Sequence, residues 1–221
     1  MVGSNMKGKV YIILSLIILL SSCNTNNDVQ KSEPTPIVST SNEKQNNMKL
    51  EDDFVLGRGS FDEDKSIEVV MRTGSFSYDR LANRRQYTGI FYIQYYQQDQ
   101  LISESKLDNI AGGTIRFHSF FDIKIQDYNA DGNFEFLIGS AAGSNGCRYN
   151  MYTITENDEI KRLKVGEYDY IYAANSTSSY ALTEEGNEIW SYKQYDQEKG
   201  YMKITLKWDG EKFIETARQQ E

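Results

Sequence analysis

Residues 51–221 are predicted to form one all-β domain. This part of the chain is rich in strand-forming residues, and the whole sequence holds 16 tyrosines and 10 phenylalanines. Glycine, asparagine and aspartate interrupt its apolar segments at short intervals, as turns do between short strands. No long window repeats at the helical period. These features predict an antiparallel meander of hairpins, arranged as propeller-like blades, a barrel or a sandwich.

The candidate strands are short segments with a high content of aromatic and β-branched residues. In chain order they are Ser66–Arg72, Thr88–Tyr96, Leu101–Lys106, Thr114–Ile125 (with a bend midway), Phe134–Ile138, Tyr149–Thr155, Ile160–Val165, Tyr180–Leu182, Glu188–Tyr195, Met202–Trp208 and Lys212–Glu215.

Polar turns are predicted to join several of these strands into hairpins. They are Gln97–Gln100, Glu156–Glu159, Glu184–Asn187 and the Asp209-Gly210 pair, a dipeptide that favours tight hairpin turns. The segment Ser77–Gln86 is the best candidate for a short helical turn.

The N-terminal residues 1–22 have the features of a secretory signal peptide. Basic residues precede an apolar run, Val10–Leu20, which as a helix would rise only about 16 Å. That is well short of the roughly 30 Å hydrocarbon core of a membrane. The next residues, "LSSC", resemble the lipobox of bacterial lipoproteins, which implies cleavage before Cys23 and acylation of Cys23 by fatty acids such as palmitate. The alternative is an ordinary secreted protein.

Residues 23–50 are predicted to be a disordered tether behind the lipidated cysteine. They are rich in Asn, Ser and Thr, show no apolar periodicity and contain both prolines of the chain, Pro34 and Pro36. The anchor would hold the domain at the outer face of the cytoplasmic membrane or at the outer membrane.

The formal net charge of −8 restricts the classes of partner. An acidic surface repels nucleic-acid phosphates and suits a basic envelope protein such as a lysozyme. With Cys23 acylated, Cys147 is alone, so no intramolecular disulfide is expected, and we expect Cys147 to be a small buried residue.

The segment "QDYNADGNFEF" carries oxygen-bearing side chains at alternate positions between two candidate strands. Its predicted calcium ligands are Asp127, Asn129, Asp131, the carbonyl of Asn133, and Glu135. Calcium takes six to eight oxygen ligands, and glycine allows the sharp turn that such a loop needs. The alternative is a hairpin turn in which the acids accept backbone N–H groups without metal.

This loop departs from an EF-hand. Strands flank it, and the position of the closing glutamate is held by Ile138, so Asp122 is considered as a replacement ligand. "DYNADGNFEFLIGS" instead resembles the calcium loops of FG-GAP/VCBS-type (integrin-α-like) repeats. That resemblance implies calcium bound between two strands of a blade, with Glu135 as a ligand. Bound calcium would stiffen the loop and the neighbouring Gly139–Gly146 segment.

The predicted function is a non-catalytic binding or interaction module of the cell envelope, with a structural calcium ion. One alternative is an inhibitor or immunity protein against lysozyme-type hydrolases, because periplasmic proteins of that kind resemble this one in acidity and calcium loop. Another is a cell-wall or polysaccharide hydrolase. The single histidine, His118, is expected to pack or face solvent, and no GxSxG motif is present. Tyrosine-rich surfaces bind sugars or proteins, but tyrosine is also an ordinary strand residue.

Overall fold

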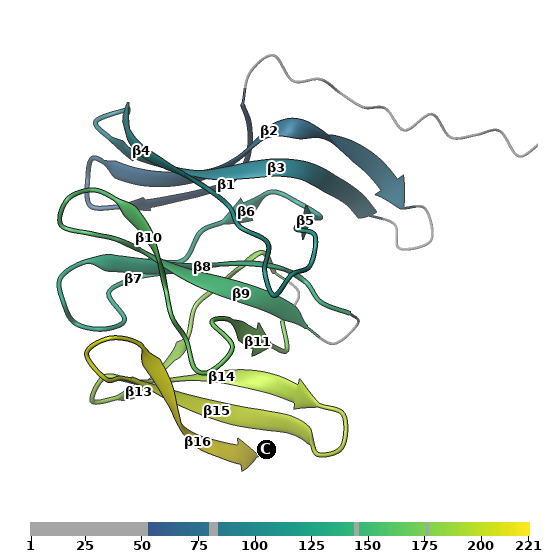
Figure 1. The fold of residues 1–221 in the computed structure, drawn as a ribbon, viewed down its shortest axis with the longest axis vertical. Helices are drawn as coiled ribbons and strands as arrows, with labels where there is room; N and C mark the ends of the chain where they lie inside the picture. The colour runs from purple at the N-terminus through teal and green to yellow at the C-terminus, as the bar shows by residue number, and fades with distance from the viewer. Residues whose placement is uncertain (1–52, 80–83, 144–145, 176) are drawn as a thin grey trace, which may run out of the picture. The chain divides into compact units, whose positions relative to one another are not determined.

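The structure is a computed structural model that describes residues 53–79, 84–143, 146–175 and 177–221 (Figure 1). The predicted signal peptide, Cys23 and the tether lie outside the described residues. Within these ranges the regular structure consists of β-strands, which confirms the predicted all-β class. The described part of the chain holds no helix of the length and apolarity needed to cross a membrane.

The first sheet contains the N-terminal strands. They are β1 (Phe54–Phe61), β2 (Lys65–Asp79), β3 (Arg84–Gln97), β4 (Gln100–Lys106), β5 (Arg116–Phe117) and β6 (Phe121–Asp122). The order is β4-β3-β2-β1-β6, with β5 beside β3. All pairs are antiparallel except β1 with β6, which run parallel.

The middle sheet is built around one long hairpin. Its strands are β7 (Ile125–Gln126), β8 (Phe134–Ala141), β9 (Cys147–Ile154), β10 (Ile160–Leu163), β11 (Ile171–Ala173) and β12 (Ser179–Tyr180). The order is β10-β9-β8-β12, with β11 beside β9 and β7 beside β8.

The third sheet is a meander of four strands in chain order. They are β13 (Thr183–Gly186), β14 (Ile189–Asp196), β15 (Gly200–Trp208) and β16 (Phe213–Gln220). The predicted hairpin turns at Gln97–Gln100, Glu156–Glu159 and Asp209-Gly210 are confirmed, whereas the turn predicted at Glu184–Asn187 lies at Asn187 and Glu188, because Glu184 to Gly186 belong to β13. Gln98 and Asp99 have φ angles of 49° and 60°, and Asn187 and Glu188 have 54° and 60°, as two-residue turns of twisted hairpins require.

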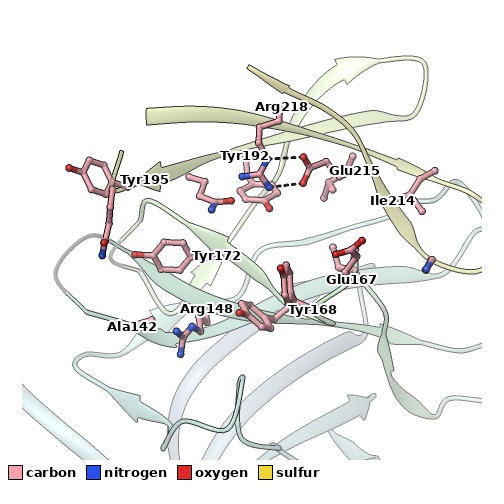
Figure 2. A pocket seen from close by; sticks show the side chains of 17 residues that line it. Ala142, Arg148, Glu167, Tyr168, Tyr172, Tyr192, Tyr195, Ile214, Glu215 and Arg218 are labelled. Carbon is pink, nitrogen blue, oxygen red and sulfur yellow. Dashed lines mark hydrogen bonds and ion pairs between the residues drawn. The ribbon is translucent and has the colours of Figure 1, made fainter. Parts of the chain in front are cut away.

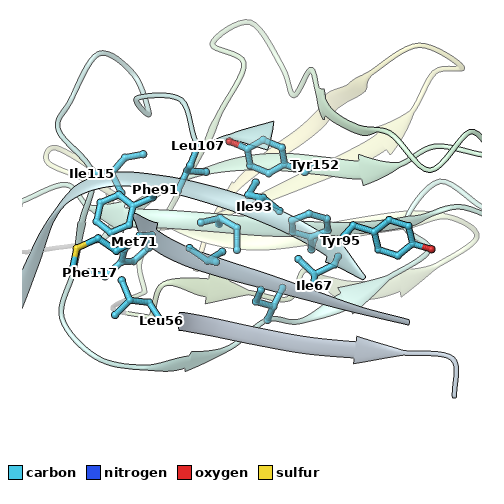
Figure 3. Close-up of a cluster of buried hydrophobic side chains, with 14 of the residues drawn as sticks. Leu56, Ile67, Met71, Phe91, Ile93, Tyr95, Leu107, Ile115, Phe117 and Tyr152 are labelled. Carbon is cyan, nitrogen blue, oxygen red and sulfur yellow. The ribbon is translucent and has the colours of Figure 1, made fainter. Parts of the chain in front are cut away.

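The middle sheet is covered on both faces, so the three sheets form stacked layers (Figure 1). Along β8, Phe136 and Ile138 belong to the apolar cluster shared with the first sheet, whereas Leu137 between them belongs to the cluster shared with the third. This follows from the two-residue period of a strand. Figure 3 shows the first cluster, where Met71 and Phe91 of the first sheet lie among the buried side chains.

The layered arrangement decides between the architectures that the sequence left open. Within the described ranges the sheets are open and packed face to face, so the barrel is wrong and a layered sandwich of meanders is observed.

Three predicted elements differ from the structure. The strand expected at Tyr180–Leu182 is displaced, because β12 covers Ser179–Tyr180 and β13 begins at Thr183. The expected helical turn is wrong, because Ser77 pairs with Gln86 and Tyr78 with Arg85 in an extension of the β2–β3 hairpin. The expected strand Thr114–Ile125 is replaced by the short strands β5, β6 and β7, which pair with three different partners.

Candidate functional site

The predicted calcium loop connects β7 to β8 in the middle sheet. Gln126 pairs with Glu135 at its base, so the backbone closes into a hairpin. Ala130 and Gly132 have φ angles of 57° and 86°, and the glycine adopts this left-handed conformation without steric cost.

The polar side chains of the loop accept hydrogen bonds from its own backbone. The Gly132 N–H donates to Asp127 Oδ2 at 3.1 Å, and the Asp131 N–H donates to Asn129 Oδ1 at 3.2 Å. The Asn133 N–H donates to Asp131 Oδ1 at 2.8 Å, while Asn129 Nδ2 donates to Asp131 Oδ2 at 2.8 Å. These are the Asx-turn bonds that the metal-free alternative anticipated. They leave one oxygen of Asp127 uncommitted.

Glu135 is the unusual residue of this site, because its side chain is fully buried. Its Oε2 accepts from the Tyr128 N–H and its Oε1 from the Thr153 hydroxyl, both at 2.8 Å. Burial raises the pKa of Glu135 to about 7, and the negative charges of Asp131 and Asp127 add to the rise. The two hydrogen bonds stabilise the charged form and lower the pKa, but their effect is smaller than that of burial. Ionisation of the carboxyl group in this position is therefore costly.

The residues of the loop fit a calcium ion in chemistry. All the donors are oxygens, and Asp127 Oδ1 is buried without any hydrogen-bond partner. In the described residues no group of three or more His, Cys, Asp or Glu side chains stands in metal-ligand geometry, since the loop carboxylates point toward backbone amides. Of the predicted ligands, Asp127, Asn129, Asp131 and Asn133 lie on the loop, and Glu135 is the second residue of β8 at its base.

The loop is fastened to the third sheet through Tyr128. Trp190 of β14 donates its indole N–H to the Tyr128 carbonyl at 2.6 Å, and the two rings meet edge to face at 4.8 Å. The Leu182 N–H donates to the Tyr128 hydroxyl at 3.3 Å. The conformation of the loop is therefore coupled to the junction between the middle and third sheets.

Two further expectations about this site are wrong. Gly139 and Ser140 lie within β8, and the connection that follows Ala141 is at the opposite end of this strand from the calcium loop. An ion at Asp127 is therefore remote from the described residues Gly139 to Gly143 at the other end of β8. Asp122 lies in β6 of the first sheet, paired with Arg58, and does not join the loop.

Other singled-out residues occupy the positions expected of structural residues. Cys147 is buried and unpaired at the start of β9. The His118 Nδ1 lies 3.1 Å from the Arg85 carbonyl oxygen, beside the β2–β3 hairpin.

Sequence reasoning missed a cleft of about 880 Å³ between the middle and third sheets. Figure 2 shows aromatic and charged side chains around it. It is lined by five tyrosines, Tyr168, Tyr170, Tyr172, Tyr192 and Tyr195. Three of these lie close together in "YDYIY", and this local concentration of tyrosine is the signal that could have revealed it. The segment is not a continuous strand, because Asp169 has a φ angle of 55° and β11 begins only at Ile171.

Comparison with protein-family models, with curated proteins and with solved structures found no match to this chain.

Proposed function

We propose that this protein is a lipid-anchored, non-catalytic binding module of the cell envelope, with calcium as a structural ion in the Asp127–Glu135 loop. The sequence of residues 1–23 supports the anchor. The observation that carries the calcium assignment is that one hairpin holds both the fully buried Glu135 carboxyl group and the buried, unpartnered Asp127 Oδ1.

The physical reason lies in the cost of burying negative charge. Unpaired buried charges are strongly destabilising, and a divalent cation among several acids removes that cost. Asp127, Asn129, Asp131, Asn133 and Glu135 would hold the ion through their oxygens. The ion would supply positive charge and fix the loop, as structural calcium does in extracellular modules.

The structural effect of the ion would reach the sheet junction. Tyr128 lies inside the loop and receives the hydrogen bonds from Trp190 and Leu182. A fixed loop holds these acceptors in place, so calcium would stabilise the packing of the third sheet on the middle sheet. The tyrosine-lined cleft lies between these same two sheets.

Thermal melting of the full chain tests the calcium assignment. Extracellular calcium modules bind with dissociation constants of about 10⁻⁴ to 10⁻³ M. At ten times the dissociation constant, binding stabilises the native state by about 1.4 kcal/mol, or roughly 3–6 °C in a domain of this size. We expect that rise when calcium replaces a chelator, and its loss in Asp131→Ala.

Asp209→Ala is the matched control. Asp209 Oδ1 also accepts two backbone N–H groups in a hairpin turn, from Glu211 and Lys212, but that turn lacks a buried acid. This variant should melt lower and keep the full calcium response. Identical melts of the native chain with chelator and with millimolar calcium would reject the metal and leave the loop as an Asx turn.

A further inference from the structure

The cleft between the middle and third sheets combines two kinds of lining. Its floor includes the buried apolar side chains of Val165 and Leu206. Its walls carry tyrosine rings from the 168–172 segment on one side and from β14 on the other (Figure 2). Tyr168 is 71% exposed and its ring centroid lies 5.9 Å from that of Tyr170. The rings of Tyr168 and Tyr170 are therefore available to pack against a ligand in the cleft.

The polar ends of these side chains have no hydrogen-bond partner within the described part of the chain. Among the residues that the structure describes, none of the five tyrosine hydroxyls of the cleft makes a hydrogen bond, and neither do the carboxamides of Gln194 and Gln197. The buried Tyr149 differs from them, because its hydroxyl donates to the Thr177 carbonyl at 2.7 Å. The cleft thus offers many hydrogen-bonding groups at once to a ligand with many hydroxyls.

The charge of the cleft is nearly balanced, which sets it apart from the acidic chain as a whole. The lining holds three cationic side chains and two carboxylates. One of each is already paired, because Arg218 donates to both oxygens of Glu215 at 2.8 Å. Arg148 lies over the ring of Tyr170, 5.7 Å from its centroid. A highly charged polymer would find little net attraction here, whereas an uncharged ligand brings no charge of its own that must be desolvated.

These three properties match one class of ligand. A sugar ring has faces of C–H groups, which pack on aromatic rings, and a rim of hydroxyls, which need donors and acceptors around them. A volume of about 880 Å³ lies within the range of pockets that enclose small ligands, and it accommodates a few sugar units. An apolar peptide would leave the hydroxyls and carboxamides of the cleft unpaired, at a cost for each group.

We infer that this cleft binds an uncharged or sparsely charged glycan chain. The inference rests on the proposed role as an envelope binding module, since that role places the cleft among polysaccharides. The glycan would not contact the calcium ion, because no residue of the Asp127–Glu135 loop lines the cleft.

The test is an array of neutral and monocarboxylated oligosaccharides of the common hexoses and N-acetylhexosamines, probed with the detergent-solubilised full chain. The best binder is then titrated by calorimetry. Tyr168→Ala should weaken binding about tenfold through the lost ring contact, whereas Tyr168→Phe should keep most of the affinity. Tyr78→Ala is the matched control, because Tyr78 is 49% exposed on the first sheet and should leave binding unchanged.

The outcomes separate the inference from the proposed function. Failure of every oligosaccharide to bind, or binding that Tyr168→Ala leaves unchanged, overturns the glycan inference. Capture of peptides but not of glycans, on a peptide array run in parallel, overturns it in favour of a peptide groove. The calcium part of the proposal is read separately, from the melts of the same preparations with chelator and with calcium.

Discussion

Replacing Glu135 by glutamine is expected to change how the free energy of unfolding depends on pH. The carboxyl is fully buried, and its pKa is raised from 4.5 to about 7. The folded state therefore binds this proton more tightly than the unfolded state. The stability that the protonated group contributes is fully present below pH 4.5 and is lost as the pH rises from 4.5 through 7.

The magnitude follows from the size of the shift. One pKa unit corresponds to 1.36 kcal/mol, so a rise of roughly 2.5 units corresponds to about 3 kcal/mol in this buried site. Glutamine stays neutral at every pH and has one carbonyl to accept from the Tyr128 N–H. In a chelating buffer, Glu135→Gln should therefore gain about 3 kcal/mol relative to the native protein between pH 4.5 and pH 8.

Urea unfolding followed by tryptophan fluorescence at several pH values measures this difference. Glu185→Gln is the control, because the Lys203 ammonium and the Ser191 hydroxyl hold the pKa of Glu185 below its ordinary value. Calcium should reverse the order at pH 8, stabilising the native protein but not Glu135→Gln. Parallel pH profiles of the native protein and Glu135→Gln in chelator would refute the reasoning.

Three further outcomes are expected. Trp190→Phe removes the indole N–H and leaves the Tyr128 carbonyl buried without this donor. The free energy of unfolding measured by chemical denaturation should fall by about 1–3 kcal/mol. An unchanged midpoint would show that this hydrogen bond contributes nothing to stability. Gly139→Ala places a Cβ 2.3 Å from the Tyr149 ring, so this overpacking should cost about 1–3 kcal/mol, and a neutral effect in the same assay would contradict the packing described. Cys23→Ser should abolish incorporation of labelled palmitate and move the protein from the membrane to the soluble fraction, whereas unchanged membrane retention would exclude the anchor.

The sequence predicted the hairpins well because their signals are local. Polar pairs such as Gln98 and Asp99 adopt the left-handed angles that their turn needs, and the tyrosine-rich end of β3 pairs with β4 across it. β1 was missed because "FVLGRGSF" contains two glycines, which lower its strand propensity. Gly57 and Gly59 are required there by packing, since a Cβ would meet Phe121 at 2.5 Å and the Ile123 carbonyl at 2.7 Å.

The site was predictable in part for the same reason. The loop residues are consecutive, so their gathering could be predicted from spacing, but the complete burial of Glu135 depends on how the sheets stack. The cleft escaped prediction because its walls come from distant segments, from Arg148 of β9 to Arg218 of β16. The spacing of residues within one segment does not indicate which distant segments lie side by side in the fold.

The attachment of Asp53 and β1 to the first sheet determines how the domain would respond to a pulling force. Asp53 accepts hydrogen bonds from Arg72 at 2.8 and 3.0 Å and from Gln94 at 2.9 Å, which clamp the start of β1 to the first sheet. β1 is otherwise bonded along one edge to β2 and only at Gly57 and Arg58 to β6. Tension applied through the N-terminus would load this clamp first and then peel β1. The cleft lies on the far side of the middle sheet from β1, so a domain pulled from its N-terminus would yield in the first sheet before the walls of the cleft are loaded.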